Sequence, residues 1–402
     1  MLDQFYPAFL SVASALHYGR YCFQPDPVDP LAVPHMNWHA LPKQAFQSLI
    51  DTLHGRGYRV VGPVVRDGAV VWDTVQRTED LPIGWRDTQE PARYRLDHSG
   101  HDRVFGVVHG PQSVKPFAFA SREPLLTIRR ASDGLSVSQM VPTAEPIALL
   151  GVRSCDLAGL AVQDRIFLGD AYADPYYQKR REGLFLVAVN CTRALSTCFC
   201  ASMGTGPEAS SGYDLVLTEL DDSFIVRSGS QRGEDIVQAL SVSPASSALQ
   251  EEAQARIRGC AESQTRGIDR ARLPQGLYDA HEHARWDDVA NRCLACTNCT
   301  MVCPTCFCHT VEEVPSLDRS SSERLRAWDS CFTPDHGAVY GKNFRPTIKD
   351  RYRQWLTHKV ASWIDQFGMS GCVGCGRCIT WCPVGIDITE ELRVLLDRKG
   401  AA

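Results

Sequence analysis

Apolar residues in the first half of the chain recur at helical and strand periods. Spacings of three and four positions predict one amphipathic helix that ends near Gly55, with its apolar face on Phe46, Leu49, Ile50 and Leu53. Two β-branched runs, at residues 58–65 and 69–75, flank an Asp-Gly turn and predict a β-hairpin. A further apolar run at residues 104–108 is expected to extend this α+β region.

The segment from residue 147 to residue 190 predicts a βαβ unit. Residues 147–152 and 184–189 are continuous apolar runs, as in strands that are covered on both faces, and residues 156–168 can form the crossover helix. Such a crossover makes the strands parallel, so their carboxyl ends share one edge of the sheet. Cys155 follows the first strand and Cys191 follows the second, and we expect both at this edge.

The second half of the chain changes to cysteine-rich turns joined by helices. A polar helix at residues 250–266 is interpreted as a connector, and an apolar stripe predicts one helix over residues 346–367 that stops at Gly368. We therefore predict an α+β or α/β domain at 37–280, followed by a mostly α-helical dicluster ferredoxin domain at 281–402. The proline-rich residues 1–36 are expected to form an N-terminal arm, to which we assign no chemistry.

Two identical cysteine runs, each closed by proline, are the strongest signal. They are Cys293-x-x-Cys296-x-x-Cys299-x-x-x-Cys303-Pro304 and Cys372-x-x-Cys375-x-x-Cys378-x-x-x-Cys382-Pro383. In two-cluster ferredoxins, three cysteines of a run hold one 4Fe-4S cluster and the fourth binds the other cluster. We therefore assign the first cluster to Cys293, Cys296, Cys299 and Cys382. The second cluster is assigned to Cys372, Cys375, Cys378 and Cys303.

Two other kinds of site use similar spacings. Paired C-x-x-C motifs also hold zinc, which would make this region a zinc-stabilised interaction module, but two identical proline-closed runs disfavour that interpretation. The spacing of Cys299, Cys303 and Cys306 matches radical S-adenosylmethionine enzymes. It is embedded in the longer ferredoxin run, which already explains it, and it does not open a recognisable barrel domain.

The remaining cysteines suggest a third metal site. A Thr-Cys-Phe-Cys segment follows the second predicted strand, so a third iron-sulfur cluster is predicted on Cys155, Cys191, Cys198 and Cys200. The alternative is a set of buried, inert thiols, because free cysteine is among the most buried residue types. The tetrapeptide recurs at residues 305–308, and further candidate ligands are therefore Cys306, Cys308 and Cys331. Cys22 and Cys260 match no pattern.

The helix before the second run is basic. Six cations at residues 342–359 face only Asp350. Positive charge near an anionic cluster raises its reduction potential, so this helix is expected to tune a cluster, to present a solvated face or to dock an acidic partner.

Composition narrows the class of protein. The chain has 402 residues, 17 cysteines and a net charge of -5, which gives no sign of binding to nucleic acid. No apolar stretch is long enough to span a membrane, and the N-terminus lacks a basic region of the secretory type. We therefore expect a cytoplasmic protein, in which clustered cysteines bind metal rather than form disulfides. Glycine-rich nucleotide-binding motifs are missing.

These motifs resemble the beta subunit of soluble NADP-linked nickel-iron hydrogenase (sulfhydrogenase), a family homologous to the corresponding iron-sulfur subunit of anaerobic sulfite reductase. Besides both cluster runs, the similar residues include Leu81-Pro82-x-Gly84, Tyr94-Arg95-Leu96, Gly110-Pro111-x-Ser113-x-Lys115-Pro116, Arg153-x-Cys155-Asp156-Leu157, Asp174-Pro175-Tyr176-Tyr177, Asn190-Cys191, the segment from Thr197 to Pro207, Cys303-Pro304-Thr305-Cys306-Phe307-Cys308, Trp328-Asp329-Ser330-Cys331 and Asn343-Phe344-Arg345.

The resemblance implies an electron-transfer subunit of an oxidoreductase complex, with no active site of its own. Its partners would be an FAD/NAD(P)-binding gamma-type subunit, together with the hydrogenase small and large subunits. Reduction of sulfur or polysulfide would be a second role of such a complex. The alternative is the corresponding iron-sulfur subunit of an anaerobic sulfite reductase, whose partner is a sirohaem subunit.

Overall fold

The computed structural model describes residues 37–397, except residues 133 and 170–171. The predicted arm at residues 1–36 and Cys22 therefore lie outside the described residues. From residue 37 onward, the described chain forms one compact unit. Among its helices, none has the length and apolar character needed to cross a membrane.

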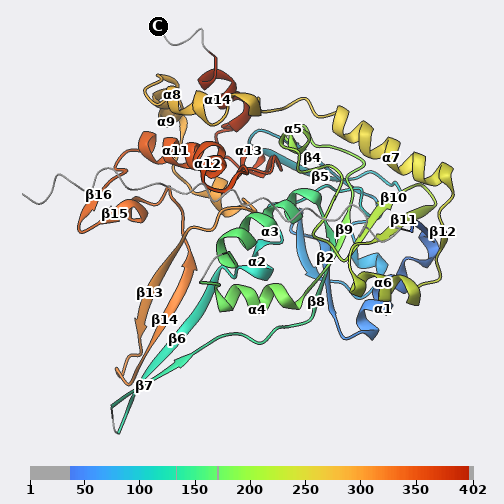
Figure 1. The fold of residues 1–402 in the computed structure, drawn as a ribbon, viewed down its shortest axis with the longest axis horizontal. Helices are drawn as coiled ribbons and strands as arrows, with labels where there is room; N and C mark the ends of the chain where they lie inside the picture. Colours follow the sequence, from blue (N-terminus) through green and yellow to red (C-terminus); the bar gives the residue numbers. More distant parts are fainter. Residues whose placement is uncertain (1–36, 133, 170–171, 398–402) are drawn as a thin grey trace, which may run out of the picture. The chain divides into compact units, whose positions relative to one another are not determined.

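An eight-stranded mixed sheet forms the centre of this unit (Figure 1). Its strand order is β12-β1-β11-β10-β9-β8-β2-β3, and the four neighbouring strands β10, β9, β8 and β2 run parallel. The strands are β1 (His39–Pro42), β2 (Arg59–Arg66), β3 (Ala69–Thr74), β8 (Ile147–Val152), β9 (Leu184–Val189), β10 (Leu215–Glu219), β11 (Ser223–Ser228) and β12 (Ser243–Pro244).

Helices cover both faces of the parallel strands. On β8, Ala148 and Leu150 face a core that includes α1 and α6, whereas Leu149 and Val152 face a second core that includes α3 and α4. The two-sided burial explains why these strands are continuous apolar runs. The helices around the sheet are α1 (Gln47–Gly55), α2 (Lys115–Ala118), α3 (Ser154–Phe167), α4 (Pro175–Gly183), α5 (Cys200–Met203), α6 (Gln231–Ala239) and α7 (Ser247–Glu262).

The predicted first helix, the β2–β3 hairpin and the parallel βαβ unit are confirmed. The predicted strand at residues 104–108 is wrong. Its backbone groups bind side chains instead of a neighbouring strand: the Glu219 carboxylate accepts from the N–H of Val104 and Phe105 at 2.8 and 2.9 Å, and Arg153 donates to nearby carbonyls. A buried loop with satisfied polar groups can carry the same apolar sequence as a strand.

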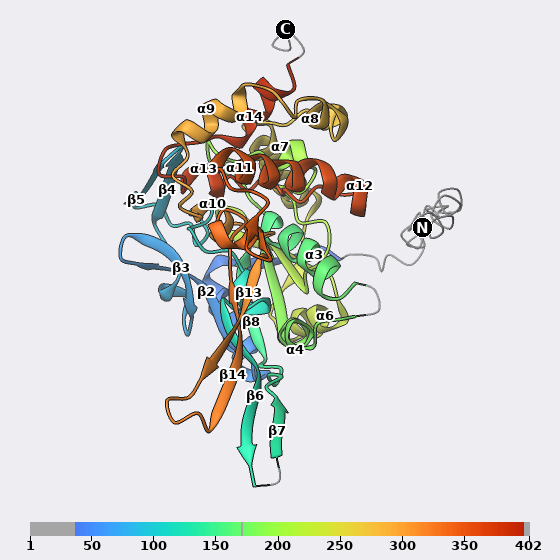
Figure 2. The ribbon, with the colours of Figure 1, turned by 90° about the vertical axis from the view of Figure 1, so that its left-hand side faces the viewer.

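A second sheet joins the two halves of the chain. Its order is β13-β14-β6-β7, and β14 pairs antiparallel with β6, more than 180 residues earlier. Both views show these long strands extending away from α11 (Figures 1 and 2). The strands of this sheet and of two smaller hairpins are β4 (Trp85–Glu90), β5 (Arg93–His98), β6 (Arg122–Ala131), β7 (Gly134–Gln139), β13 (His309–Pro315), β14 (Ser321–Trp328), β15 (Ala338–Val339) and β16 (Lys342–Asn343).

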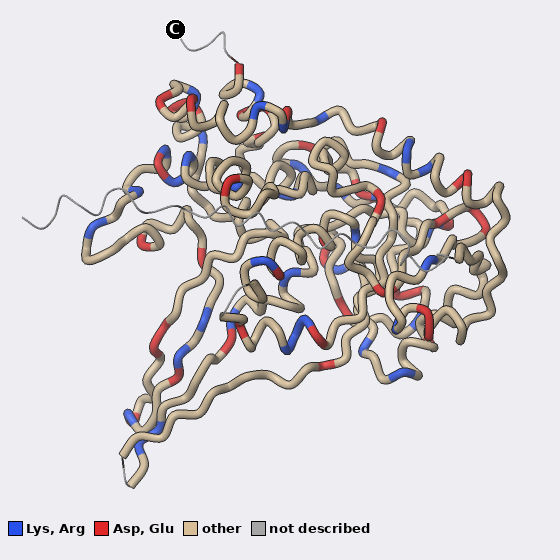
Figure 3. Tube along the Cα trace, in the orientation of Figure 1, with Lys and Arg blue, Asp and Glu red and all other residues tan. Residues whose placement is uncertain are grey.

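Charges of both signs follow the strands of the second sheet (Figure 3). Exposed Arg324 on β14 pairs with Glu313 on β13, and Arg122 on β6 pairs with Glu312 at 3.6 Å. Because each of these side chains is half exposed, such pairs add little stability. They do keep the outer strands polar, which discourages pairing with other chains.

The C-terminal region is a mixture of helices and strands. The predicted mostly helical character is not confirmed, because β13 and β14 lie between the two cysteine runs. Short 3-10 turns occur at Lys43–Ala45, Thr78–Asp80, Arg270–Arg272 and Pro334–Gly337. The helices are α8 (Gln275–Asp279), α9 (Arg285–Arg292), α10 (Asn298–Met301), α11 (Ile348–Thr357), α12 (Trp363–Phe367), α13 (Arg377–Thr380) and α14 (Ile388–Leu395).

The predicted long helix before the second run is present but contains a π-helical turn. It begins at Ile348 behind a capping box of Thr347 and Asp350, and it ends at Gly368, which has a φ of 70°. Between α11 and α12 the residues His358–Ser362 form the π turn. Such turns often mark functional sites, and Lys359 lies in this one.

Candidate metal centres

The two cysteine runs adopt the same backbone conformation. In the first run, Ala295 and Thr297 have positive φ angles of 49° and 69°, and α10 follows. In the second run, Gly374 and Gly376 occupy the equivalent positions with φ angles of 65° and 77°, and α13 follows. The sequence repeat is therefore also a structural repeat, in which left-handed residues turn the cysteines toward a common centre.

The fourth cysteine of the second run lies with the first run. Burial raises the pKa of the Cys293 and Cys299 thiols, and the neighbouring charges that add to this rise include Cys296 and Cys382 in both cases. All four cysteines line one apolar hollow, together with Phe332, Tyr352, Trp355 and Ile386. Backbone N–H groups point at two of the sulfurs: Ala295 N lies 3.4 Å from Cys293 Sγ, and Ile386 N lies 3.3 Å from Cys382 Sγ.

The fourth cysteine of the first run lies with the second run. Burial raises the pKa of Cys378, and the thiolates of Cys372, Cys375 and Cys303 add to the rise. The structure thus brings together both sets of four that the crossed assignment requires.

The spacing of these thiols bears on the kind of metal. Within the described residues, no three Cys, His, Asp or Glu side chains converge closely enough to hold one metal ion. A zinc ion needs its thiolates about 2.3 Å away, whereas an iron-sulfur cube holds them apart by its own width. The grouping fits clusters better than zinc.

A buried lysine contacts the second set. Lys359 Nζ donates to Cys303 Sγ at 3.3 Å, to Cys306 Sγ at 3.5 Å, to Thr305 Oγ1 at 3.0 Å and to Gly371 O at 3.2 Å. A hydrogen bond from the Cys306 thiol and the charge of Lys359 hold the pKa of Cys303 well below its usual range. Lys359 therefore places a positive charge directly on a candidate cluster ligand.

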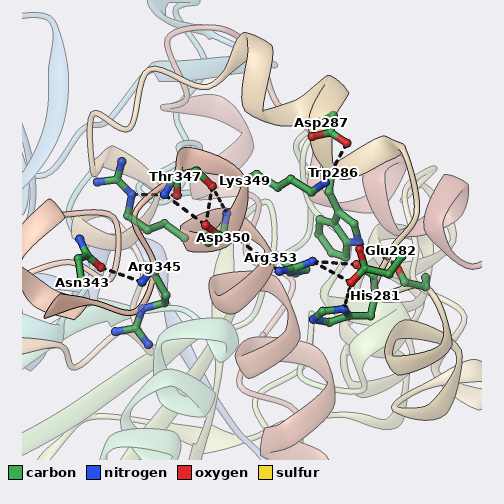
Figure 4. A network of polar contacts seen from close by, with 12 residues as sticks. His281, Glu282, Trp286, Asp287, Asn343, Arg345, Thr347, Lys349, Asp350 and Arg353 are labelled. Carbon is green, nitrogen blue, oxygen red and sulfur yellow. Dashed lines mark hydrogen bonds and ion pairs between the residues drawn. The ribbon is translucent and has the colours of Figure 1, made fainter. Parts of the chain in front are cut away.

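Other cations of the predicted basic helix are engaged elsewhere (Figure 4). Lys349 pairs with Asp287 at 2.9 Å, and Arg353 pairs with Asp350 at 3.3 Å and with Glu282 at 3.7 Å. Of the three expected roles, tuning of a cluster fits Lys359, whereas Lys349 and Arg353 form ion pairs on the surface.

A buried ion pair fastens the second run to the large sheet. Arg377, which is fully buried, donates to Asp156 Oδ2 at 3.0 Å and to Gly110 O at 3.3 Å. The His109 ring lies 2.9 Å from Cys375 O. Asp156 belongs to α3, directly after β8, so the predicted strand-end crevice is filled by the second cysteine run.

The four cysteines of the predicted third site do not form one group. Cys191 and Cys198 pack together, but Cys155 packs with Val373 and Cys375 of the second run. The cysteine that joins Cys191 and Cys198 is Cys260 on α7, which matched no motif. Its signal was helical spacing: the buried residues of this polar helix are Ala253, Ile257 and Cys260.

The remaining three candidate ligands form two pairs. Cys306 lies beside Cys303 and Lys359. Cys308 is hydrogen-bonded to Cys331 and to His336, which together lower the pKa of Cys308 to about 4. Asp329 contacts the His336 ring at 2.7 Å. Cys306, Cys308 and Cys331 thus do not share one centre.

The repeated cysteine runs define an iron-sulfur protein, and residues 292–386 match the family model described as a 4Fe-4S dicluster domain. The chain is 36% identical over 366 residues to sulfhydrogenase 2 subunit beta of Pyrococcus furiosus, and the match covers 89% of this chain and 99% of that relative. No solved structure matches. The chain belongs to the family of sulfhydrogenase beta subunits.

Proposed function

We propose that this chain relays electrons through two 4Fe-4S clusters with crossed ligation. The ligands of the first cluster are Cys293, Cys296, Cys299 and Cys382. Those of the second cluster are Cys372, Cys375, Cys378 and Cys303. The observation that carries the proposal is the position of each fourth cysteine among the first three cysteines of the other run.

The protein side chains would hold and tune the clusters, and the clusters would supply the one-electron chemistry. Phe332, Trp355 and Ile386 give the first centre an apolar wall that limits access of water. Backbone N–H groups and Lys359 direct hydrogen bonds at the sulfurs. Such contacts stabilise the reduced, more negative form of a cluster.

The first centre is the one nearer the surface. Cys296 is exposed, and the side chain of its neighbour Leu294 is 63% exposed, whereas Cys372 and Cys375 of the second centre are buried. Electron transfer slows with distance, so a partner would exchange electrons most readily at the first centre.

We assign the partners from the family. An FAD/NAD(P)-binding gamma-type subunit would deliver or accept electrons on one side, and the hydrogenase small and large subunits would do so on the other. Reduction of sulfur or polysulfide by the complex is a further part of the proposal. The name of the relative favours this complex over an anaerobic sulfite reductase. A compartment that keeps thiols reduced, such as the cytoplasm, suits this role.

Purification from the native organism tests the complex. A tagged chain, isolated without oxygen, is expected to carry with it a flavin subunit together with a nickel-containing large subunit. Co-purification of a sirohaem subunit without nickel would contradict the hydrogenase assignment but leave the relay intact.

Replacing Lys359 with methionine is expected to lower the reduction potential of the second cluster. The substitution removes a buried positive charge about 3–4 Å from a ligand sulfur, and at an effective dielectric constant near 20 the loss corresponds to roughly 100 mV. Redox titration followed by EPR measures the shift.

Two further variants separate charge from packing. Lys359→Arg keeps the charge and is expected to retain most of the potential. Lys349→Met removes a charge from the same helix at the Asp287 pair and should change it far less. Equal shifts in Lys359→Met and Lys349→Met would refute the tuning role.

A further inference from the structure

We propose that a third iron-sulfur cluster is held by Cys191, Cys198, Cys200 and Cys260. The proposal rests on the proposed relay and extends it by one centre. It replaces Cys155, which the strand-end pattern suggests, with Cys260, which no motif marks.

The four cysteines converge from three segments. Cys191 follows β9, Cys198 and Cys200 lie before and at the start of α5, and Cys260 lies in the last turn of α7. Cys191, Cys198 and Cys260 share one buried cluster, lined also by Val108 and Leu195, and none of the four residues is more than 9% exposed. Cys200 is close enough to Cys191 and Cys260 to interact electrostatically with both.

The surroundings suit an anionic cluster better than four neutral thiols. Arg153, Arg193 and Cys191 line the same cavity of about 420 Å³. Arg153 is only 5% exposed and donates to backbone carbonyls, and within the described residues it forms no ion pair. A buried cation without a carboxylate partner is costly, and a cluster with four thiolates would supply the missing negative charge.

A polar side chain is aimed at one of the sulfurs. Gln264 Nε2 donates to Cys200 Sγ at 3.3 Å. Inert buried thiols need no such donor, whereas hydrogen bonds to ligand sulfurs are a regular feature of iron-sulfur sites. The contact adds an independent reason to place a thiolate at Cys200.

Cys155 has different surroundings. Burial and the neighbouring Asp156 carboxylate raise the pKa of its thiol well above the usual range. Its packing partners are Val373 and Cys375, so it lies against the second run. Cys155 is therefore a matched control: a buried cysteine near the same place that is not expected to bind iron.

The third site adjoins the second cysteine run through backbone contacts. Phe199 N donates to Gly374 O at 2.9 Å, and a Cβ atom added to Gly374 would lie 2.7 Å from Cys200 Cα. Only glycine permits this approach of the two ligand loops. Electrons could then pass from the second cluster to the third over a short distance.

Iron and acid-labile sulfide per chain, measured with low-temperature EPR, test the proposal. The unaltered protein, purified without oxygen, is expected to hold about twelve irons. The Cys198→Ala/Cys260→Ala variant should hold about eight and keep the EPR signals of the two ferredoxin-type clusters. Cys155→Ala should hold about twelve.

Each opposite result overturns the third site. About eight irons in the unaltered protein, an unchanged count in the double variant, or loss of about four irons in Cys155→Ala would each do so. Where the double variant is insoluble, Cys260→Ser serves instead, and an unchanged EPR spectrum would then count against the site. Failure of the two-cluster relay would show differently, as a count below about eight in the unaltered protein.

Discussion

Replacing Cys372 and Cys375 with alanine is expected to remove about four irons per chain and to leave the first cluster in place. These two residues supply half of the ligands of the second cluster, and a cube with two thiolates is not retained. Iron analysis and EPR of the reduced variant measure the loss.

Further substitutions in that variant separate crossed from uncrossed ligation. With crossed ligation, adding Cys382→Ala removes or alters the remaining cluster, because Cys382 lies with Cys293 and Cys299. Adding Cys303→Ala has no further effect on it. If Cys303→Ala destroys the remaining cluster and Cys382→Ala leaves it unchanged, each run binds its own cluster and our assignment is wrong.

Replacing Asp156 with asparagine is expected to lower the free energy of unfolding by about 3–5 kcal/mol, because it leaves the Arg377 charge buried without a counterion. The two side chains are 1% and 0% exposed. Arg377 lies between Cys375 and Cys378, so weaker binding of the second cluster is expected as well. Urea denaturation without oxygen, compared at matched iron content, measures the change.

Two controls accompany this variant. Glu313→Gln breaks an exposed ion pair on the outer strands and is expected to cost less than about 1 kcal/mol. Asp156→Asn combined with Arg377→Met removes both charges and should restore part of the stability. A cost for Asp156→Asn no larger than that for Glu313→Gln would show that the pair does not fasten the second run.

Those parts of the fold that depend on local pattern could be predicted from the sequence. The β2–β3 hairpin follows from its turn, and the parallel strands β8 and β9 follow from two-sided burial. The pairing of β14 with β6 could not be predicted, because no local signal connects residues so far apart in sequence. The apolar loop at residues 104–108 was mistaken for a strand because its donors bind the distant Glu219.

The candidate site divides in the same way. The two runs were recognisable because spacing within ten residues sets their local geometry, and the left-handed residues at Gly374 and Gly376 follow from it. Cys260 was missed because it reaches Cys191 only through the packing of α7. Lys359 appeared as one of six cations, and only the π-helical turn shows that it points inward.

The central claim is that two clusters lie close enough together to pass electrons. Low-temperature EPR of the fully reduced protein, with iron and sulfide analysis, tests it most directly. We predict at least about eight irons with matching sulfide, and a spectrum broadened by magnetic interaction between clusters that simplifies in Cys372→Ala/Cys375→Ala. Zinc in place of iron, or two signals that add without interaction, would contradict the account.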